Sequence, residues 1–80
     1  MIYKRGQRYI LKRTAVQQLL AGHSTIAHEH DSLLDQGYGW PRITVNVAMS
    51  GLATVRATWR MRAGDCRHTH RLIIRGVRLA

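Results

Sequence analysis

The clearest pattern in the chain is a strict alternation of apolar and polar residues over positions 53–63, with the odd-numbered positions apolar. A period of two places successive side chains on opposite faces of a β-strand, so one face meets a core and the other is polar. The outward row would be Thr54, Arg56, Thr58, Arg60 and Arg62. The same alternation predicts a strand over 42–49, whose inward residues are Ile43, Val45, Val47 and Met49.

Turn residues predict how these strands pair. Gly64-Asp65 has the form of a two-residue type II′ loop, which would join 53–63 to a return strand over 66–75. That loop places Trp59 opposite His70 and Val55 opposite Ile74, so the turn and the hydrophobic pattern select one register. Beyond the last of these pairs the apolar positions shift phase, and Gly76 predicts a bulge or bend.

The pairing of 42–49 with 53–63 depends on a weaker turn signal at Ser50-Gly51. Matching core residue to core residue places Val47 opposite Val55 and Ile43 opposite Trp59, with a three-residue loop over 50–52. This register also sets Arg42 opposite Arg60, just as the other hairpin sets Arg62 opposite Arg67.

The first half of the chain is less regular. Residues 2–13 predict a strand or a hairpin broken at Gly6, with Tyr9 and Leu11 facing inward. Residues 14–17 have the form of a capping box, which predicts a short helix ending near Gly22; continuation of the first strand is the alternative. Residues 23–41 predict a long loop with at most a short helical turn.

These elements predict one small domain over 1–80. The expected fold class is mainly β with small α content: an antiparallel meander with one short helix and a long loop, which could close into a small five-stranded barrel.

Charge changes the picture of the outward face. The formal net charge is +9, from 13 basic and 4 acidic residues, and the acids concentrate in the middle of the chain. Guanidinium groups suit phosphate oxygens, and the predicted outward face carries no carboxylate. A solvated face, whose arginine stems cover apolar surface, explains the same pattern. The candidate polyanion-binding residues are Arg42, Arg56, Arg60, Arg62, Arg67, Arg71 and Arg75.

Other chemistry has little support in the sequence. The single cysteine excludes an intrachain disulfide. A metal site built from Cys66 and the histidines His23, His28, His30, His68 and His70 is open, but packed histidines explain the same spacing better. No nucleophile has an evident orienting partner, so we expect no enzyme, no cofactor and no metal. No stretch is long and apolar enough to span a bilayer.

The segment over residues 23–41 carries several apolar residues, and a domain of this size has only a small core in which to bury them. We expect several of them to contact a partner subunit, with the nearby acids Glu29, Asp31 and Asp35 meeting a neighbour's arginines. The alternative is that the segment folds back over its own sheet. The candidate interface residues are Leu33, Leu34, Tyr38 and Trp40.

The stretch over 53–76, ATVRATWRMRAGDCRHTHRLIIRG, resembles the C-terminal hairpin of the head–tail adaptor (head-closure) proteins of tailed phages. Residues 9–13 are similar to the opening strand of that family. The resemblance covers less than half of the chain, and residues 14–41 depart from the family pattern. It implies a small β-barrel in a ring of identical subunits around a DNA channel, without catalysis.

The expected function is therefore that of a non-enzymatic structural or binding module in a multi-subunit, phage-like assembly, with its arginine face towards DNA. The expected partners are other protein subunits and DNA or another polyanion, without a membrane. The expected location is the cytoplasm or a virion assembled there. The alternatives are a stand-alone nucleic-acid-binding regulator and a small inhibitor of an acidic protein surface.

Overall fold

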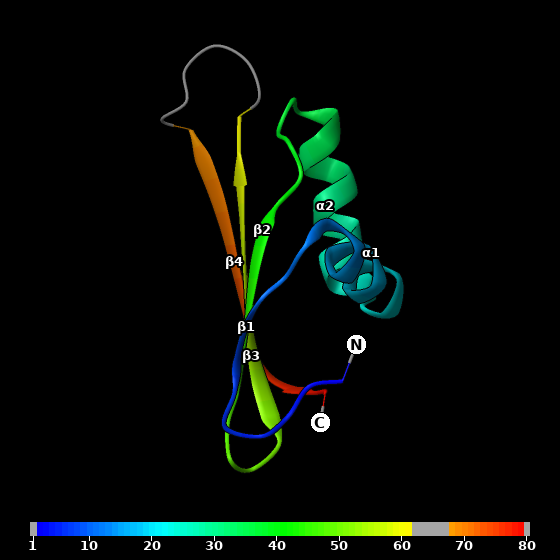
Figure 1. Cartoon of the computed structure of the whole chain (residues 1–80). Coiled ribbons are helices and arrows are strands. Elements are labelled where there is room, and N and C mark those ends of the chain that lie inside the picture. Colours follow the sequence, from blue (N-terminus) through cyan, green and yellow to red (C-terminus); the bar gives the residue numbers. More distant parts are fainter. Residues whose placement is uncertain (1, 62–67, 80) are drawn as a thin grey trace.

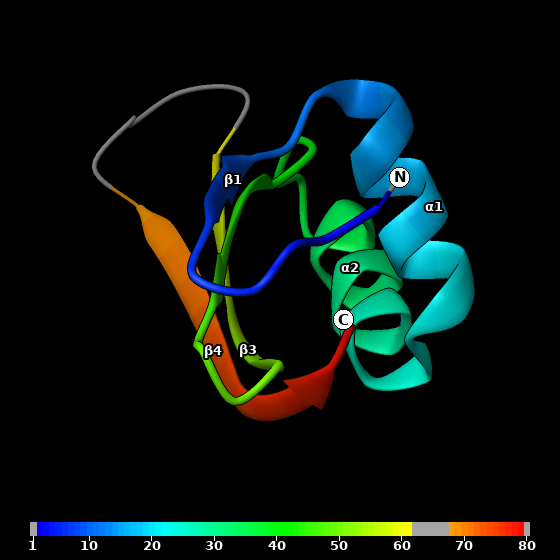
Figure 2. The same ribbon diagram turned by 60° about the horizontal axis from the view of Figure 1, so that its bottom comes forward.

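The computed structural model describes residues 2–61 and 68–79 (Figure 1). A four-stranded antiparallel sheet has the order β1-β2-β3-β4, and two helices precede β2 in the sequence. Both helices and the N-terminal segment lie on one side of this sheet (Figures 1 and 2). The elements are β1 (Arg8–Ile10), α1 (Arg13–Gly22), α2 (Ser24–Asp35), β2 (Arg42–Val47), β3 (Leu52–Arg60) and β4 (Thr69–Arg78).

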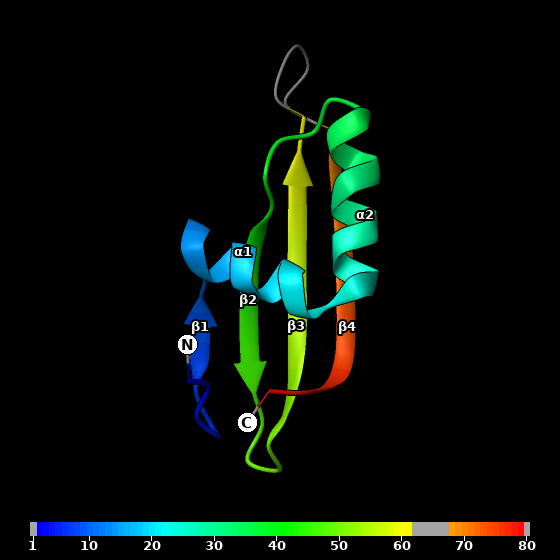
Figure 3. The same ribbon diagram turned by 90° about the vertical axis from the view of Figure 1, so that its right-hand side faces the viewer.

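The core lies between the helices and the inner face of the sheet. In Figure 3, α1 crosses in front of the sheet, while α2 runs along the side occupied by β4. Trp59, on the central strand β3, is fully buried with 0% of its surface exposed. The other buried apolar residues are Leu11, Val16, Leu19, Leu20, Ile26, Leu33, Ile43, Val45, Val47, Ala53, Val55 and Ala57.

The antiparallel meander is confirmed, but the closed barrel is wrong. The short strand β1 and the long strand β4 lie at opposite edges of the sheet. The inner apolar face is covered by helices instead of by a return of the sheet on itself (Figure 3). An apolar sheet face needs such a cover, and two helices supply it without closure.

The prediction of a long loop over 23–41 is wrong, because α2 occupies most of that segment. Its buried residues are Ile26, His30 and Leu33, a spacing of four and three residues that lies on one helical face. Because histidine counts as a polar residue, a hydrophobicity pattern does not reveal this buried stripe. The predicted first helix exists, but it begins at Arg13 and its N-cap is Lys12, so the capping box is wrong.

The predicted register of β3 with β4 is confirmed. Trp59 pairs with His70, and Val55 pairs with Ile74. The register shifts between Ala53 and Val55, opposite Gly76, whose φ of 72° lies in the left-handed region that glycine tolerates. The predicted Gly64-Asp65 turn and the pair of Arg62 with Arg67 lie outside the described residues.

The predicted register of β2 with β3 is wrong by two positions. Val47 pairs with Ala53, and Ala48 donates a backbone hydrogen bond to Leu52 across the turn, with an N–O distance of 2.9 Å. The loop is therefore residues 49–51, and Gly51, at φ 91°, takes its last position, where a three-residue loop needs a left-handed residue. Met49 consequently lies outside the strand with 75% of its surface exposed.

Candidate polyanion-binding face

The open face is the side of the sheet opposite the helices. It carries the outward residues of all four strands, because each strand alternates burial along its length. We define the face arginines as the exposed arginines that line the two grooves described below, namely Arg8, Arg42, Arg56, Arg60, Arg71 and Arg75. Between them lie the polar residues Thr44, Asn46, Thr54 and Thr58. Over the described residues, no helix covers this side of the sheet (Figure 1).

The corrected register spaces the arginines apart across strands. Arg42 and Arg71 both lie beside Thr58, one on each neighbouring strand, whereas the sequence predicted Arg42 opposite Arg60. Arg56 lies between Thr44 and Ile73. Like charges directly opposite one another are destabilising, so alternation with threonine and isoleucine reduces repulsion on the face.

Two grooves lie between the arginine side chains. The first has a volume of about 340 Å³ and is lined by Trp40, Arg42, Thr58, Arg60 and Arg71. The second has a volume of about 370 Å³ and is lined by Arg8, Thr44, Asn46, Thr54, Arg56 and Arg75. Each groove therefore brings three guanidinium groups together over a floor that carries hydroxyl or amide groups, all of which bind phosphate oxygens.

In the described part of the chain, negative charge lies away from this face. The acids Glu29, Asp31 and Asp35 all belong to α2, on the other side of the sheet. Among the described residues, no ion pair joins a carboxylate to a face arginine. Glu29 instead contacts His70, with 2.9 Å between Glu29 Oε1 and His70 Nε2. The face arginines are therefore available to an external anion.

A buried aromatic cluster supports the sheet behind the first groove. Trp59 Nε1 donates a hydrogen bond to His30 Nδ1 across 3.1 Å. The rings of His30 and Trp40 meet edge to face with their centroids 4.6 Å apart. The Arg13 guanidinium carbon lies 3.6 Å from the centre of the Trp40 ring, as in a cation–π contact. Trp40 is thus engaged by side chains from both helices.

His30 is held as a neutral imidazole. Its Nδ1 accepts a hydrogen bond, so the proton lies on Nε2, which is buried and has no partner among the described residues. Burial lowers the pKa of His30 below its usual value of 6.5; the Asp31 carboxylate opposes this shift and Arg13 reinforces it.

Acidification should therefore destabilise the fold through His30. Below a pH of about 6.5 the unfolded chain binds a proton at His30 and the folded chain does not, so the free energy of unfolding decreases until the pH reaches the lowered pKa of the folded state. Urea unfolding at pH 7.5 and at pH 5 should show this loss. His30→Gln keeps an acceptor for the indole and cannot titrate, so its loss should be smaller. An equal loss in both proteins would contradict this assignment.

The predicted partner residues lie largely within the chain itself. Leu33 is in the core with 3% of its surface exposed, so the expectation that it meets a partner is wrong. Leu34, Tyr38 and Trp40 are half-buried. Formation of α2 explains the difference, because a helix folds this segment back over its own sheet.

The candidate metal ligands do not converge in the described part of the chain. His23 lies between the helices, His28 is exposed on α2, and His30 is buried on it. His68 is exposed, His70 faces Glu29, and Cys66 lies outside the described residues. Among the residues that the structure describes, no group of three or more histidine, cysteine or acidic side chains could hold a metal ion.

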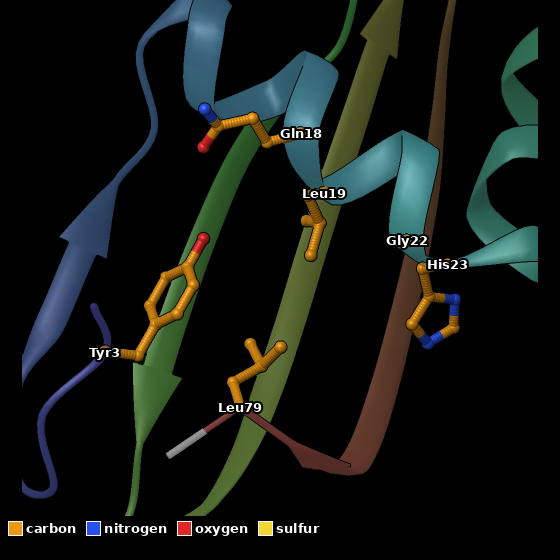
Figure 4. A pocket seen from close by; sticks show the side chains of 6 residues that line it. All are labelled: Tyr3, Gln18, Leu19, Gly22, His23 and Leu79. Carbon is orange, nitrogen blue, oxygen red and sulfur yellow. The ribbon is translucent and has the colours of Figure 1, made fainter. Parts of the chain in front are cut away.

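A separate hollow of about 270 Å³ lies on the helix side of the sheet (Figure 4). Leu19 on α1 and Leu79 near the end of the described chain approach it from opposite sides, with Tyr3 beside them (Figure 4). Its full lining is Tyr3, Gln18, Leu19, Gly22, His23 and Leu79. This hollow carries no face arginine and belongs to a different surface.

The structure brings five of the predicted polyanion-binding residues onto one face: Arg42, Arg56, Arg60, Arg71 and Arg75. Arg62 and Arg67 lie outside the described residues. Sequence reasoning missed Arg8, which pairs with Asn46 on the open face. The alternation of Arg8 with the inward residue Tyr9 indicates that Arg8 faces outward, but a strand of only three residues gives a weak pattern.

Comparison with known proteins identifies no relative: no protein-family model, curated protein or solved structure matches this chain. Of the helices in the described residues, neither has the length and apolar character needed to cross a membrane. The open face is therefore interpreted from its own geometry and charge.

Proposed function

We propose that this protein is a non-enzymatic module that binds the phosphate backbone of nucleic acid through its open face. One observation carries the proposal: six arginines from four strands share a surface on which no described carboxylate pairs with them. Phosphate contacts from arginine, threonine and asparagine supply affinity that is largely independent of base sequence.

Nucleic acid fits this surface better than an acidic protein patch does. The face arginines extend over all four strands and line two separate grooves, which suits a ligand with regularly repeated charges. Ile73 and Ile10 lie among them with 42% and 68% of their surfaces exposed. Apolar side chains between the cations can contact sugar rings without reading bases, so we expect little sequence discrimination.

A role as one subunit of a larger, phage-like assembly is the second candidate. The observation that favours it is the position of β4, a strand of ten residues at the edge of the sheet. The outer backbone groups of an edge strand are free to pair with a strand of another chain. The resemblance of 53–76 to head–tail adaptor proteins agrees with such a role, although the described strands form an open sheet and not the barrel that it implies.

Nuclear magnetic resonance can test where DNA binds. We expect a short duplex to shift the Nε–Hε signals of Arg42, Arg56 and Arg71, because their guanidinium groups exchange water for phosphate oxygens. The signal of Arg5, which lies outside the strands and lines neither groove, should stay in place and serves as the internal control. Shifts confined to Arg13 and the helices, or uniform over all arginines, would overturn the proposal.

A further inference from the structure

We propose that the open face contains two discrete phosphate-binding cradles, whose spacing suits double-stranded nucleic acid rather than a single strand. This inference rests on the proposed function and adds the class of nucleic acid and the way it is held. The cradles are defined by the strand register and by the two grooves.

The near cradle is centred on Thr58. Its cross-strand neighbours are Arg42 on β2 and Arg71 on β4, each about 4.8 Å away between strands. Arg56 and Arg60 lie two residues to either side along β3 and share its face. The guanidinium groups of Arg42, Arg60 and Arg71 line the 340 Å³ groove together with Thr58, while Arg56 lines the neighbouring groove. This arrangement can hold one phosphate with several charge-assisted hydrogen bonds.

The far cradle lies over Thr54 and Asn46, which are cross-strand partners. Arg8 is the partner of Asn46 on the other side, while Arg75 lies on β4 at the register shift beside Thr54. Together with Arg56 they line the 370 Å³ groove. This second group of three guanidinium groups shares no arginine with the 340 Å³ groove.

The distance between the cradles is set by β3. Thr54 and Thr58 are four residues apart on one strand, which corresponds to about 13 Å at a rise of about 3.3 Å per residue. The major groove of B-form DNA is about 12 Å wide. The four strands span about 14 Å from β1 to β4 before side chains are added, so the sheet is too wide to enter that groove. It can instead lie across the groove, with one cradle at each phosphate rim.

A single strand of nucleic acid lacks, among the described residues of this face, aromatic side chains on which to stack its bases. Proteins that hold single strands stack the bases on aromatic side chains. In the described residues, no tyrosine or tryptophan projects from β1–β4 onto the open face, since Tyr9 and Trp59 face the core. Trp40 borders the near groove, but Arg13 covers its ring and His30 packs against it. Stacking energy is therefore not available on this face.

The test compares the affinity of the full chain for a 20-base-pair DNA duplex and for each of its separate strands by fluorescence anisotropy. We expect the duplex to bind at least tenfold more tightly than either strand. Arg42→Gln with Arg71→Gln removes the flanks of the near cradle, and Arg8→Gln with Arg75→Gln removes those of the far one. Each pair should weaken duplex binding tenfold or more and reduce the salt slope by about 1.8, at about 0.9 per lost contact.

The control is Lys4→Gln with Lys12→Gln, which removes the same charge from residues outside all four strands. It should change duplex affinity less than threefold. Equal affinity for duplex and single strand, or a cradle pair that behaves like the lysine control, would overturn the two-cradle arrangement while leaving backbone binding by the face intact. Absence of binding to either form of DNA would overturn both proposals. Circular dichroism and melting curves check that every variant folds.

Discussion

Trp59→Ala is expected to lower the free energy of unfolding by about 3–5 kcal/mol, the usual cost of deleting a large buried aromatic ring. The indole has 0% of its surface exposed on the inner face of β3 and packs near the rings of His30 and His70. Small domains have total stabilities towards the low end of about 5–15 kcal/mol. We therefore expect the variant to be largely unfolded near 37 °C in thermal melts, where the parent chain is folded.

The polar part of this effect can be separated from the packing part. Trp59→Phe and His30→Leu should each cost about 1–3 kcal/mol, because each leaves the other half of a buried hydrogen bond without a partner. The double variant should cost less than the sum of the two, since neither polar group then remains. Urea unfolding of the four proteins measures this coupling. Additive losses would show that the hydrogen bond contributes nothing.

Replacement of Arg56, Arg60 and Arg71 together by Gln is expected to weaken duplex DNA binding by about 100-fold near 100 mM salt. Three fewer phosphate contacts release three fewer sets of counterions, which also makes the salt slope shallower by about 2.7. Glutamine keeps much of the side-chain length, and all three positions are exposed, so melting should change little. Fluorescence anisotropy over a salt series checks both numbers. Unchanged binding would leave these arginines with only a solvation role.

The strands were predictable because apolar and polar residues alternate along a strand that has one buried face and one exposed face. The register of β3 with β4 followed from pairs such as Trp59 with His70, and the bulge followed from Gly76. The predicted register of β2 with β3 was wrong because pairing core residues with core residues is satisfied equally by registers that differ by two residues. The left-handed position that Gly51 fills at the end of the loop decides between them.

The helix α2 was not predictable from hydrophobicity, because its buried stripe includes His30. The indole of Trp59, distant in sequence, supplies a hydrogen-bond partner for this buried histidine. The candidate polyanion-binding face was likewise predictable from the sequence only in part. Alternation along each strand predicted which arginines face outward, whereas α2, which covers the opposite face, forms from a segment that was predicted to be a loop.

The salt dependence of DNA binding by the unmodified chain tests the central claim most directly. If all six face arginines contact phosphates, the logarithm of the duplex association constant should fall against the logarithm of salt concentration with a slope of about −5. Between about 50 and 200 mM salt this corresponds to a loss of about 10³-fold in affinity. A slope shallower than about −2, or no binding at the lowest salt, would contradict the assignment of the open face as a backbone-binding surface.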